Sequence, residues 1–151
     1  MIKIHFTYSD SFFSKIIRLF TGDKYTHIEI EINGSCYSAK PFKGVYKQSY
    51  INLKNTYNNN LDTFFIEYLT KLQTEKIETF LKAQVGKGYD YKSAIACGLW
   101  QRDWANDLDR WFCSELVAKA LSIAGVHAVN QYYRPYKLTP KDISLSPILI
   151  K

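Results

Sequence analysis

The sequence is poor in cysteine, and its three cysteines are far apart: Cys36, Cys97 and Cys113. No two of them form a CxxC pair, and an odd number does not make a disulfide framework. This usage is typical of a reducing compartment. The histidines and cysteines also lack the paired ligand spacing of zinc sites. The pattern therefore predicts no bound metal and no other cofactor.

Long apolar runs are absent as well. No stretch approaches the roughly 18 residues that a bilayer-spanning helix needs. Residues 1–6 are too polar for a signal peptide. We therefore expect a cytoplasmic protein with no transmembrane segment. If it acts elsewhere, it must be delivered or released by a route that needs no secretion signal.

Positive charge is in excess but forms no stripe. The net charge of +6 favours anionic partners, such as a cell-wall polymer or a membrane surface. Specific nucleic-acid binding is not expected, because no basic run has interleaved aromatic residues. With 46% apolar and 16% aromatic residues, the chain can bury a sizeable core. No repeat or linker divides it, which predicts one domain over residues 1–151 and leaves the oligomeric state open.

The first third of the chain has the clearest pattern. Alternation of apolar and polar residues predicts a strand over residues 2–6, and helical spacing after it predicts a helix that Gly22 ends. Residues 27–32 alternate again. They are followed by an Asn-Gly turn at 33–34, the strongest short signal for a β-hairpin. The return strand covers residues 35–40.

A two-residue turn fixes which residues of the hairpin face one another. The predicted pairs are Ile32 with Ser35, Glu29 with Ser38, and His27 with Lys40. Cross-strand partners share a face of the sheet. The side chains of the last two pairs therefore lie opposite the isoleucines of residues 27–32. Such a polar face is usually exposed to solvent, and that is the expectation here.

Beyond the hairpin, the pattern predicts three more strands and four helices. The strands cover residues 44–50, 63–69 and 148–150, loops cover 52–60 and 101–110, and helices cover 74–85, 91–99, 113–124 and a segment that begins at Thr139-Pro140. Thr74 is the expected cap of the first of these helices. Gly125 is the expected end of the third.

Cys113 is the strongest candidate for chemistry, because it opens the predicted helix 113–124 directly after a polar loop. The helix dipole and the unpaired N–H groups at that end favour a thiolate. A cysteine that only fills the core would more often lie in the middle of a helix. Cys36 and Cys97 have no such setting, and we expect both to be structural.

A nucleophilic cysteine needs an imidazole as its base. His27, on the polar side of the strand 27–32, is the best candidate. His5 is the main alternative and also lies on the polar side of a strand. His127 follows the helix and fits a loop. The question that remains is whether His27 and Cys113 meet.

Residues Phe112-Cys113-Ser114-Glu115-Leu116-Val117 resemble the nucleophile segment of NlpC-like, papain-fold cysteine hydrolases. Histidine precedes cysteine here, which is similar to the circularly permuted branch that includes YiiX-like and lecithin retinol acyltransferase-like proteins. The other stretches that resemble this branch are 17–22 with Tyr25-Thr26-His27, Ser38-Ala39 with Gly44-Val45, 86–90, and Leu138-Thr139-Pro140-Lys141-Asp142. Together these stretches cover nearly the whole chain.

The resemblance implies an α+β, permuted papain-like fold, with a small antiparallel sheet or half-barrel packed on the helix that opens with Cys113. It implies that Cys113 forms an acyl-enzyme and that His27 first removes and later returns a proton. The backbone N–H of Cys113 would hold the oxyanion, with the Tyr89 hydroxyl nearby. An ordinary core aromatic explains Tyr89 equally well.

The residue that orients His27 is less clear. The family usually places a polar residue, often Glu or His, on the strand after the histidine, and that position matches Ser38. A serine adds no charge, so Glu29, on the same face as His27, is the alternative. Glu115 lies in the first turn after the nucleophile, where it favours the helix dipole.

The function that follows is a cysteine hydrolase that cleaves an amide bond, with a peptidoglycan stem peptide as the first candidate substrate. The alternatives are a lipid acyl hydrolase or acyltransferase, and a non-catalytic binding or structural module that retains the fold. The uncharged Ser38 is the main support for the last of these.

Overall fold

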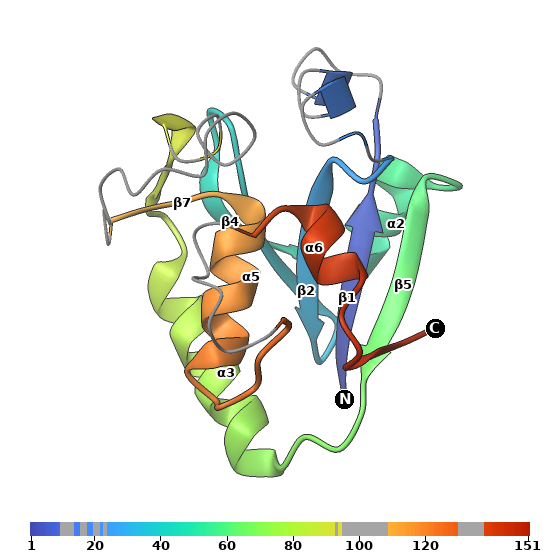
Figure 1. Ribbon diagram of the computed structural model, residues 1–151. Coiled ribbons are helices and arrows are strands. Elements are labelled where there is room, and N and C mark those ends of the chain that lie inside the picture. The colour runs from blue at the N-terminus through green and yellow to red at the C-terminus, as the bar shows by residue number, and fades with distance from the viewer. Residues whose placement is uncertain are drawn as a thin grey trace.

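An antiparallel sheet forms the centre of the computed structural model (Figure 1). Its strands are β1 (Ile2–Thr7), β2 (His27–Ile32), β3 (Ser35–Lys40), β4 (Gly44–Ser49), β5 (Leu61–Ile66) and β8 (Leu149–Ile150), in the spatial order β4-β3-β2-β1-β5-β8. A separate parallel pair joins β6 (Gly88–Tyr89) to β7 (Arg110–Trp111). The helices are α2 (Tyr50–Tyr57), α3 (Lys71–Gln84), α5 (Cys113–Ser122) and α6 (Pro140–Ser144). The fold is α+β, as the sequence predicts.

The structure describes residues 1–9, 14–15, 18–19, 22, 24–92, 94, 109–129 and 138–151. Much of the helix predicted before Gly22 lies outside these ranges, as do most of the segments 91–99 and 101–110, including Cys97. Within these ranges, no helix is long and apolar enough to cross a membrane.

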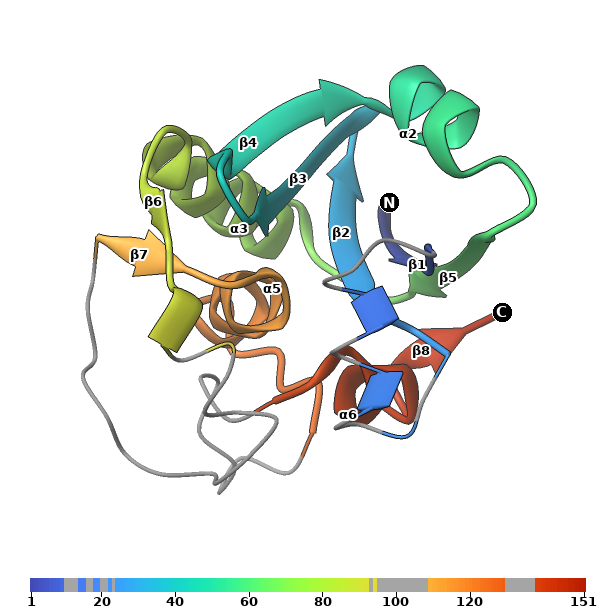
Figure 2. The ribbon, with the colours of Figure 1, turned by 90° about the horizontal axis from the view of Figure 1, so that it is seen from above.

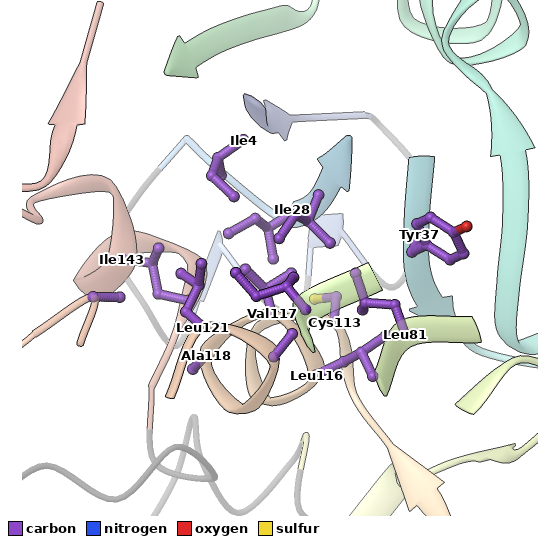
Figure 3. Packing of buried hydrophobic residues seen from close by; sticks show 14 of the residues in the cluster. Ile4, Ile28, Tyr37, Leu81, Cys113, Leu116, Val117, Ala118, Leu121 and Ile143 are labelled. Carbon is purple, nitrogen blue, oxygen red and sulfur yellow. The ribbon is translucent and has the colours of Figure 1, made fainter. Parts of the chain in front are cut away.

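The apolar face of the sheet packs against helices. Ile4 and Ile28 are fully buried, and Figure 3 shows them next to Val117 and Leu121 of α5, with Ile143 of α6 beside the same cluster. Burying one such side chain stabilises the fold by roughly 1.5–3 kcal/mol. Figure 2 shows the sheet curving around α5, which is the half-barrel arrangement expected.

The Asn-Gly turn forms as predicted. Asn33 and Gly34 have φ angles of 50° and 78°, which is the left-handed backbone that a tight hairpin turn requires. The paired residues of the ladder are Ile32–Ser35, Glu31–Cys36 and Ile30–Tyr37. The ladder stops there, so the two predicted pairs beyond it, Glu29–Ser38 and His27–Lys40, do not form.

The polar face of the hairpin is covered, and the expectation that it faces solvent is wrong. His5 and Glu29 are 0% exposed, and Glu31 is 5% exposed. Helix α2 lies over this face, where the Tyr50 ring stacks on His5 with centroids 5.2 Å apart. Figure 2 shows α2 on the side of the sheet away from α5.

Helix α2 replaces the surface loop that the asparagine-rich residues 52–60 predicted. Ser49 caps it by accepting a hydrogen bond from the Asn52 N–H, and Leu53 is fully buried. Tertiary burial of one apolar side chain and a good cap outweigh the weak helix propensity of asparagine.

Helix α3 begins earlier than predicted. Its cap is Thr70 and not Thr74, because Thr70 and Gln73 form a reciprocal capping box. The Thr74 hydroxyl instead donates to the Thr70 carbonyl within the first turn. At α6, the predicted cap Thr139 forms the same kind of box with Asp142.

The segment after α3 is bound to the start of β4. The Val45 N–H donates to the Lys87 carbonyl at 2.8 Å, and the Gly86 N–H donates to the Val45 carbonyl at 2.9 Å. Gly44 has a φ of 69°, and a side chain there would collide with the Lys87 carbonyl. This junction positions β6, whose partner β7 leads directly into Cys113.

Candidate active site

Cys113 is the first residue of α5 and follows the buried cap residue Phe112. The apolar stripe of the helix, including Leu116 and Val117, fixes the helix against the sheet. This packing leaves Cys113 6% exposed (Figure 3). The backbone N–H groups of Ile28, Ser114 and Cys113 itself lie close enough to the sulfur to favour its charged form and oppose the rise in the thiol pKa. Cys113, the candidate nucleophile, therefore lies beside Ile28 of β2, and Ile28 is the residue that follows His27.

The β2–β3 ladder ends at the pair Ile30–Tyr37, before it reaches Ile28. The Ser38 hydroxyl donates to the Ile28 carbonyl at 2.6 Å, in place of a ladder hydrogen bond. The N–H and C=O of one residue in an antiparallel strand point to the same side. The Ser38 hydroxyl thus takes the Ile28 carbonyl, and the Cys113 sulfur lies near the Ile28 N–H. Ser38 contacts the backbone of β2 and not the His27 ring.

His27 has two side-chain partners. Its Nε2 lies 3.3 Å from Glu29 Oε1 and 3.2 Å from the Tyr46 hydroxyl oxygen. The Tyr46 hydroxyl donates to Glu29 Oε1 at 2.6 Å, so its oxygen accepts from Nε2. Nε2 therefore carries the proton. Nδ1 remains the basic nitrogen of His27.

Glu29 is a buried carboxylate with several donors. Besides Tyr46 and His27, the Gln48 amide donates at 2.9 and 3.0 Å, and the Lys40 ammonium lies 3.5 Å away. Burial alone would raise the pKa of Glu29. The hydrogen bond of His27, the charge that His27 carries when it is protonated at acid pH, the charge of Lys40 and the hydrogen bond of Tyr46 outweigh burial and lower that pKa to about 2. Glu29 is therefore ionised throughout the neutral range.

Cys113 and His27 are both neutral in this arrangement. Burial raises the pKa of the Cys113 thiol to about 11, although the nearby backbone N–H groups oppose this. Burial lowers the pKa of His27, although Glu29 opposes this. The thiolate expected from the helix end is therefore not the resting form. Among the hydrogen bonds of the described residues, none joins the Cys113 sulfur to the His27 ring.

Tyr89, the predicted second oxyanion donor, lies near enough to Cys113 for a charge on the sulfur to affect its pKa. It is half-buried on β6, and its ring makes an edge contact with Tyr91 at a centroid distance of 5.0 Å. Burial raises the pKa of Tyr89, and the neighbouring Cys113 raises it further. The hydroxyl is therefore a neutral donor near the nucleophile.

Two other polar side chains of the first helical turn are buried. Glu115 is 7% exposed and Ser114 is 0% exposed. Within the described residues, Glu115 Oε2 and the Ser114 hydroxyl have no hydrogen-bond partner. Burial raises the pKa of Glu115 to about 7, and the charge of Asp90 adds to the effect. Burial, rather than the helix dipole, therefore dominates the state of Glu115.

Sequence reasoning missed Tyr46 and Gln48. Both lie on β4, two positions apart, and the sheet register places them opposite Ser38 and Cys36. The alternation of side chains between the two faces of the strand predicted at residues 44–50 was the sequence signal that could have placed them on one face. The pairing of β3 with β4 was needed to bring that face to Glu29.

One group in the described part of the chain could hold a metal ion. It consists of His5, Glu31 and Cys36, whose ligand atoms all lie within 4.8 Å of one another. Each residue comes from a different strand, which is why no paired spacing appears in the sequence.

Comparison with solved structures finds the same fold in a protein of Escherichia coli O157:H7. The crystal structure of the metalloprotein YiiX (DUF1105) superposes with a TM-score of 0.72 at 21% sequence identity, covering 98% of this chain and 93% of that one. No protein-family model matches the sequence. No curated protein matches it significantly either. The chain therefore has a YiiX-like fold.

Proposed function

We propose that this protein is a cysteine hydrolase that works through an acyl-enzyme, with Cys113 as nucleophile, His27 as base and Glu29 as the residue that orients His27. The observation that carries the proposal is the buried contact of the His27 ring with Glu29 and Tyr46. It fixes the tautomer with Nδ1 free to accept a proton. A base held by a third group in this way is typical of activated nucleophiles.

The proposed reaction begins from a neutral thiol and a neutral imidazole. As the Cys113 sulfur attacks the substrate carbonyl, its proton passes to Nδ1 of His27 and the new carbon–sulfur bond forms. The backbone N–H of Cys113 and the Tyr89 hydroxyl would stabilise the negative carbonyl oxygen. His27 then protonates the leaving amine, the carbon–nitrogen bond breaks, and water, deprotonated by His27, releases the acid and the free thiol.

Glu29 supplies the charge that Ser38 lacks, and this favours the enzyme over a non-catalytic module. When His27 takes the thiol proton it becomes a cation beside the buried Glu29 carboxylate. A pair of opposite charges in a buried site is stabilised strongly relative to a single charge. The network thus favours the proton transfer that the mechanism needs.

An amide in a cell-wall stem peptide is the substrate that we propose first. The net charge of +6 favours association with an anionic cell-wall polymer.

An acyl lipid is the second candidate, and a surface feature favours it. Phe42, in the turn between β3 and β4, is 86% exposed and has a φ of 63°. Its N–H donates to the Tyr91 hydroxyl at 2.7 Å, and Tyr91 contacts Tyr89 of the site. An exposed aromatic beside Lys43, close to the catalytic residues, is suited to a lipid surface.

Acyl-enzyme trapping tests the proposal. The protein is mixed with an activated acyl ester, quenched in acid and digested, and the acylated cysteine is identified by mass spectrometry. We expect the adduct on Cys113 and not on Cys36, whose pKa is raised to about 12 chiefly by burial. His27→Ala should lower the acylation rate by about 10²-fold or more, and His127→Ala, at an exposed position, is the matched control.

The proposal fails if Cys113 is not acylated, or if His27→Ala and His127→Ala have equal effects. Parallel incubations with purified peptidoglycan and with phosphatidylcholine vesicles distinguish the substrates. New amino groups from the first support the peptide amidase, and released fatty acid from the second supports the lipid hydrolase.

A further inference from the structure

The covered face of the sheet holds a second cluster of reactive side chains, away from the chemistry assigned to Cys113. His5 on β1, Glu31 on β2 and Cys36 on β3 come from three adjacent strands. Glu31 lies directly across from Cys36 in one ladder and across from Lys3 in the other. His5 is two positions from Lys3 on the same strand and so reaches Glu31 diagonally.

We propose that His5, Glu31 and Cys36 form a zinc-binding site that joins the three central strands. Imidazole nitrogen, carboxylate oxygen and thiolate sulfur are the three donor types that Zn²⁺ takes in proteins. The donor atoms all lie within 4.8 Å of one another. Zinc bond lengths in a tetrahedral site separate such atoms by roughly 3.3–3.6 Å. The 2.7 Å between His5 Nε2 and Glu31 Oε2 must therefore widen by roughly 0.6 Å, and no other donor pair must close by more than roughly 1.5 Å.

The surroundings of His5 suit a ligand. Its Nδ1 lies 2.9 Å from the Thr63 hydroxyl and its Nε2 lies 2.7 Å from Glu31 Oε2. When Nδ1–H donates to Thr63, the Nε2 lone pair faces the carboxylate, and a cation between them satisfies both acceptors. Metal-bound histidines are commonly held in this way by a partner on the other nitrogen. Stacking on Tyr50 further fixes the ring.

The charge of the site also balances with zinc. Zn²⁺ together with one thiolate and one carboxylate is neutral, and a neutral group is the cheapest one to bury. Cys36 and His5 are both 0% exposed. Lys3 now donates to Glu31 at 3.0 and 3.3 Å, and its side chain is 27% exposed. The fourth position of the metal would be taken by water.

The alternative is that these residues form only a hydrogen-bonded cluster. In the other tautomer, Nε2–H donates to Glu31 and the Thr63 hydroxyl donates to Nδ1, which satisfies the same atoms without a metal. The two readings differ in what removing Lys3 does. In the hydrogen-bonded cluster, Lys3 only stabilises Glu31. In a zinc site, Lys3 competes with the ion.

Cobalt and zinc titration of the full chain tests the site. The protein is stripped with a chelator and the variant Cys97→Ser/Cys113→Ser is prepared, which leaves Cys36 as its single thiol. We expect one Co²⁺ per chain with a thiolate-to-metal charge-transfer band, displaced by one equivalent of Zn²⁺, and a raised melting temperature with zinc. The charge-transfer band should be absent in Cys36→Ser. In His5→Gln the affinity for the metal should fall at least 100-fold.

Two further variants guard against loss of folding as an explanation. Thr63→Val should lower zinc affinity by about 10–100-fold. Lys3→Met should raise it roughly tenfold, because one competing positive charge is gone. The proposal is overturned if the single-thiol variant shows no thiolate band, if Cys36→Ser retains the band, or if Lys3→Met weakens binding. None of these measurements depends on activity at Cys113, so the zinc site and the hydrolase stand or fall separately.

Discussion

Glu29 is the side chain on which the candidate site depends most, because its buried charge is shared among His27, Tyr46, Gln48 and Lys40. Neutralising it should leave His27 in place but remove the charge that stabilises the imidazolium. We expect Glu29→Gln to lower kcat by about 10²-fold, with a smaller change in KM. Steady-state kinetics on the substrate identified by the assays above measure both.

The pH profile separates this positioning role from a general loss of structure. The Glu29 charge raises the pKa of His27 against the lowering effect of burial. Removing the charge lowers that pKa further, so the acidic limb of the kcat profile should move to lower pH in Glu29→Gln. Ser38→Ala is the matched control, since it removes the bond to the Ile28 carbonyl at a cost of about 1–2 kcal/mol in stability. If Ser38→Ala shifts the limb and Glu29→Gln does not, the assignment of Glu29 is wrong.

Helix α5 contains a buried glutamate, Glu115, whose ionisation makes the stability of the fold depend on pH. Burial raises the pKa of Glu115 to about 7 in the folded chain, against 4.5 for an unperturbed glutamate. Between these two pH values the folded state binds more protons than the unfolded state, so stability falls as the pH rises from about 4.5 to 7. The loss approaches about 3 kcal/mol above pH 8.

Glu115→Gln should remove this dependence. The amide oxygen of the glutamine can still accept a hydrogen bond from the Phe112 backbone N–H. The amide group carries no charge at either pH. We expect the variant to be more stable than the parent by about 1–3 kcal/mol at pH 8 and nearly equal to it at pH 4.5. Urea unfolding at the two pH values measures the difference. An equal gain at both would show that the effect is packing and not ionisation.

The start of helix α3 has two threonines that could act as the cap, Thr70 and Thr74. Both Thr70 and Thr74 are threonines before apolar residues, but only Thr70 has a glutamine three positions later that can complete the box. We expect Thr70→Ala to cost about 1 kcal/mol and Thr74→Ala to cost less than half of that. Chemical denaturation of the two variants decides, and equal losses would contradict the capping assignment.

Local patterns in the sequence predicted the elements whose signals are contained within a few residues. The Asn-Gly turn, the alternation of the first two strands and the cap at Thr139 all formed as expected. The apolar stripe of residues 113–124 correctly identified the helix on which the sheet packs. These signals are strong because backbone geometry alone fixes them.

Long-range pairing decided what the sequence did not predict. The polar faces of β1 and β2 look like solvent-exposed faces in the sequence, but α2 covers them and buries Leu53 completely. Tyr46 reaches His27 only through the register of β3 with β4. Burial by tertiary packing also raises the pKa of Cys113. The expectation of a thiolate at the start of a helix considered only the helix dipole and did not include this burial.

The junction between the sheet and the segment that carries Tyr89 offers a last prediction, at Gly44. Gly44 and Gly34 both have positive φ angles, 69° and 78°. A methyl group at Gly34 meets nothing within 4 Å, whereas one at Gly44 collides with the Lys87 carbonyl. Gly34→Ala should therefore cost only the backbone strain, about 1–2 kcal/mol.

Gly44→Ala should cost at least about 1 kcal/mol more than Gly34→Ala, because the Lys87 carbonyl must move and its hydrogen bond from Val45 weakens. The same movement displaces β6, and with it Tyr89, so acylation of Cys113 should slow in Gly44→Ala and stay unchanged in Gly34→Ala. Denaturation and acylation rates measure the two effects. If both variants lose the same stability and keep the same acylation rate, the junction does not couple the sheet to the site.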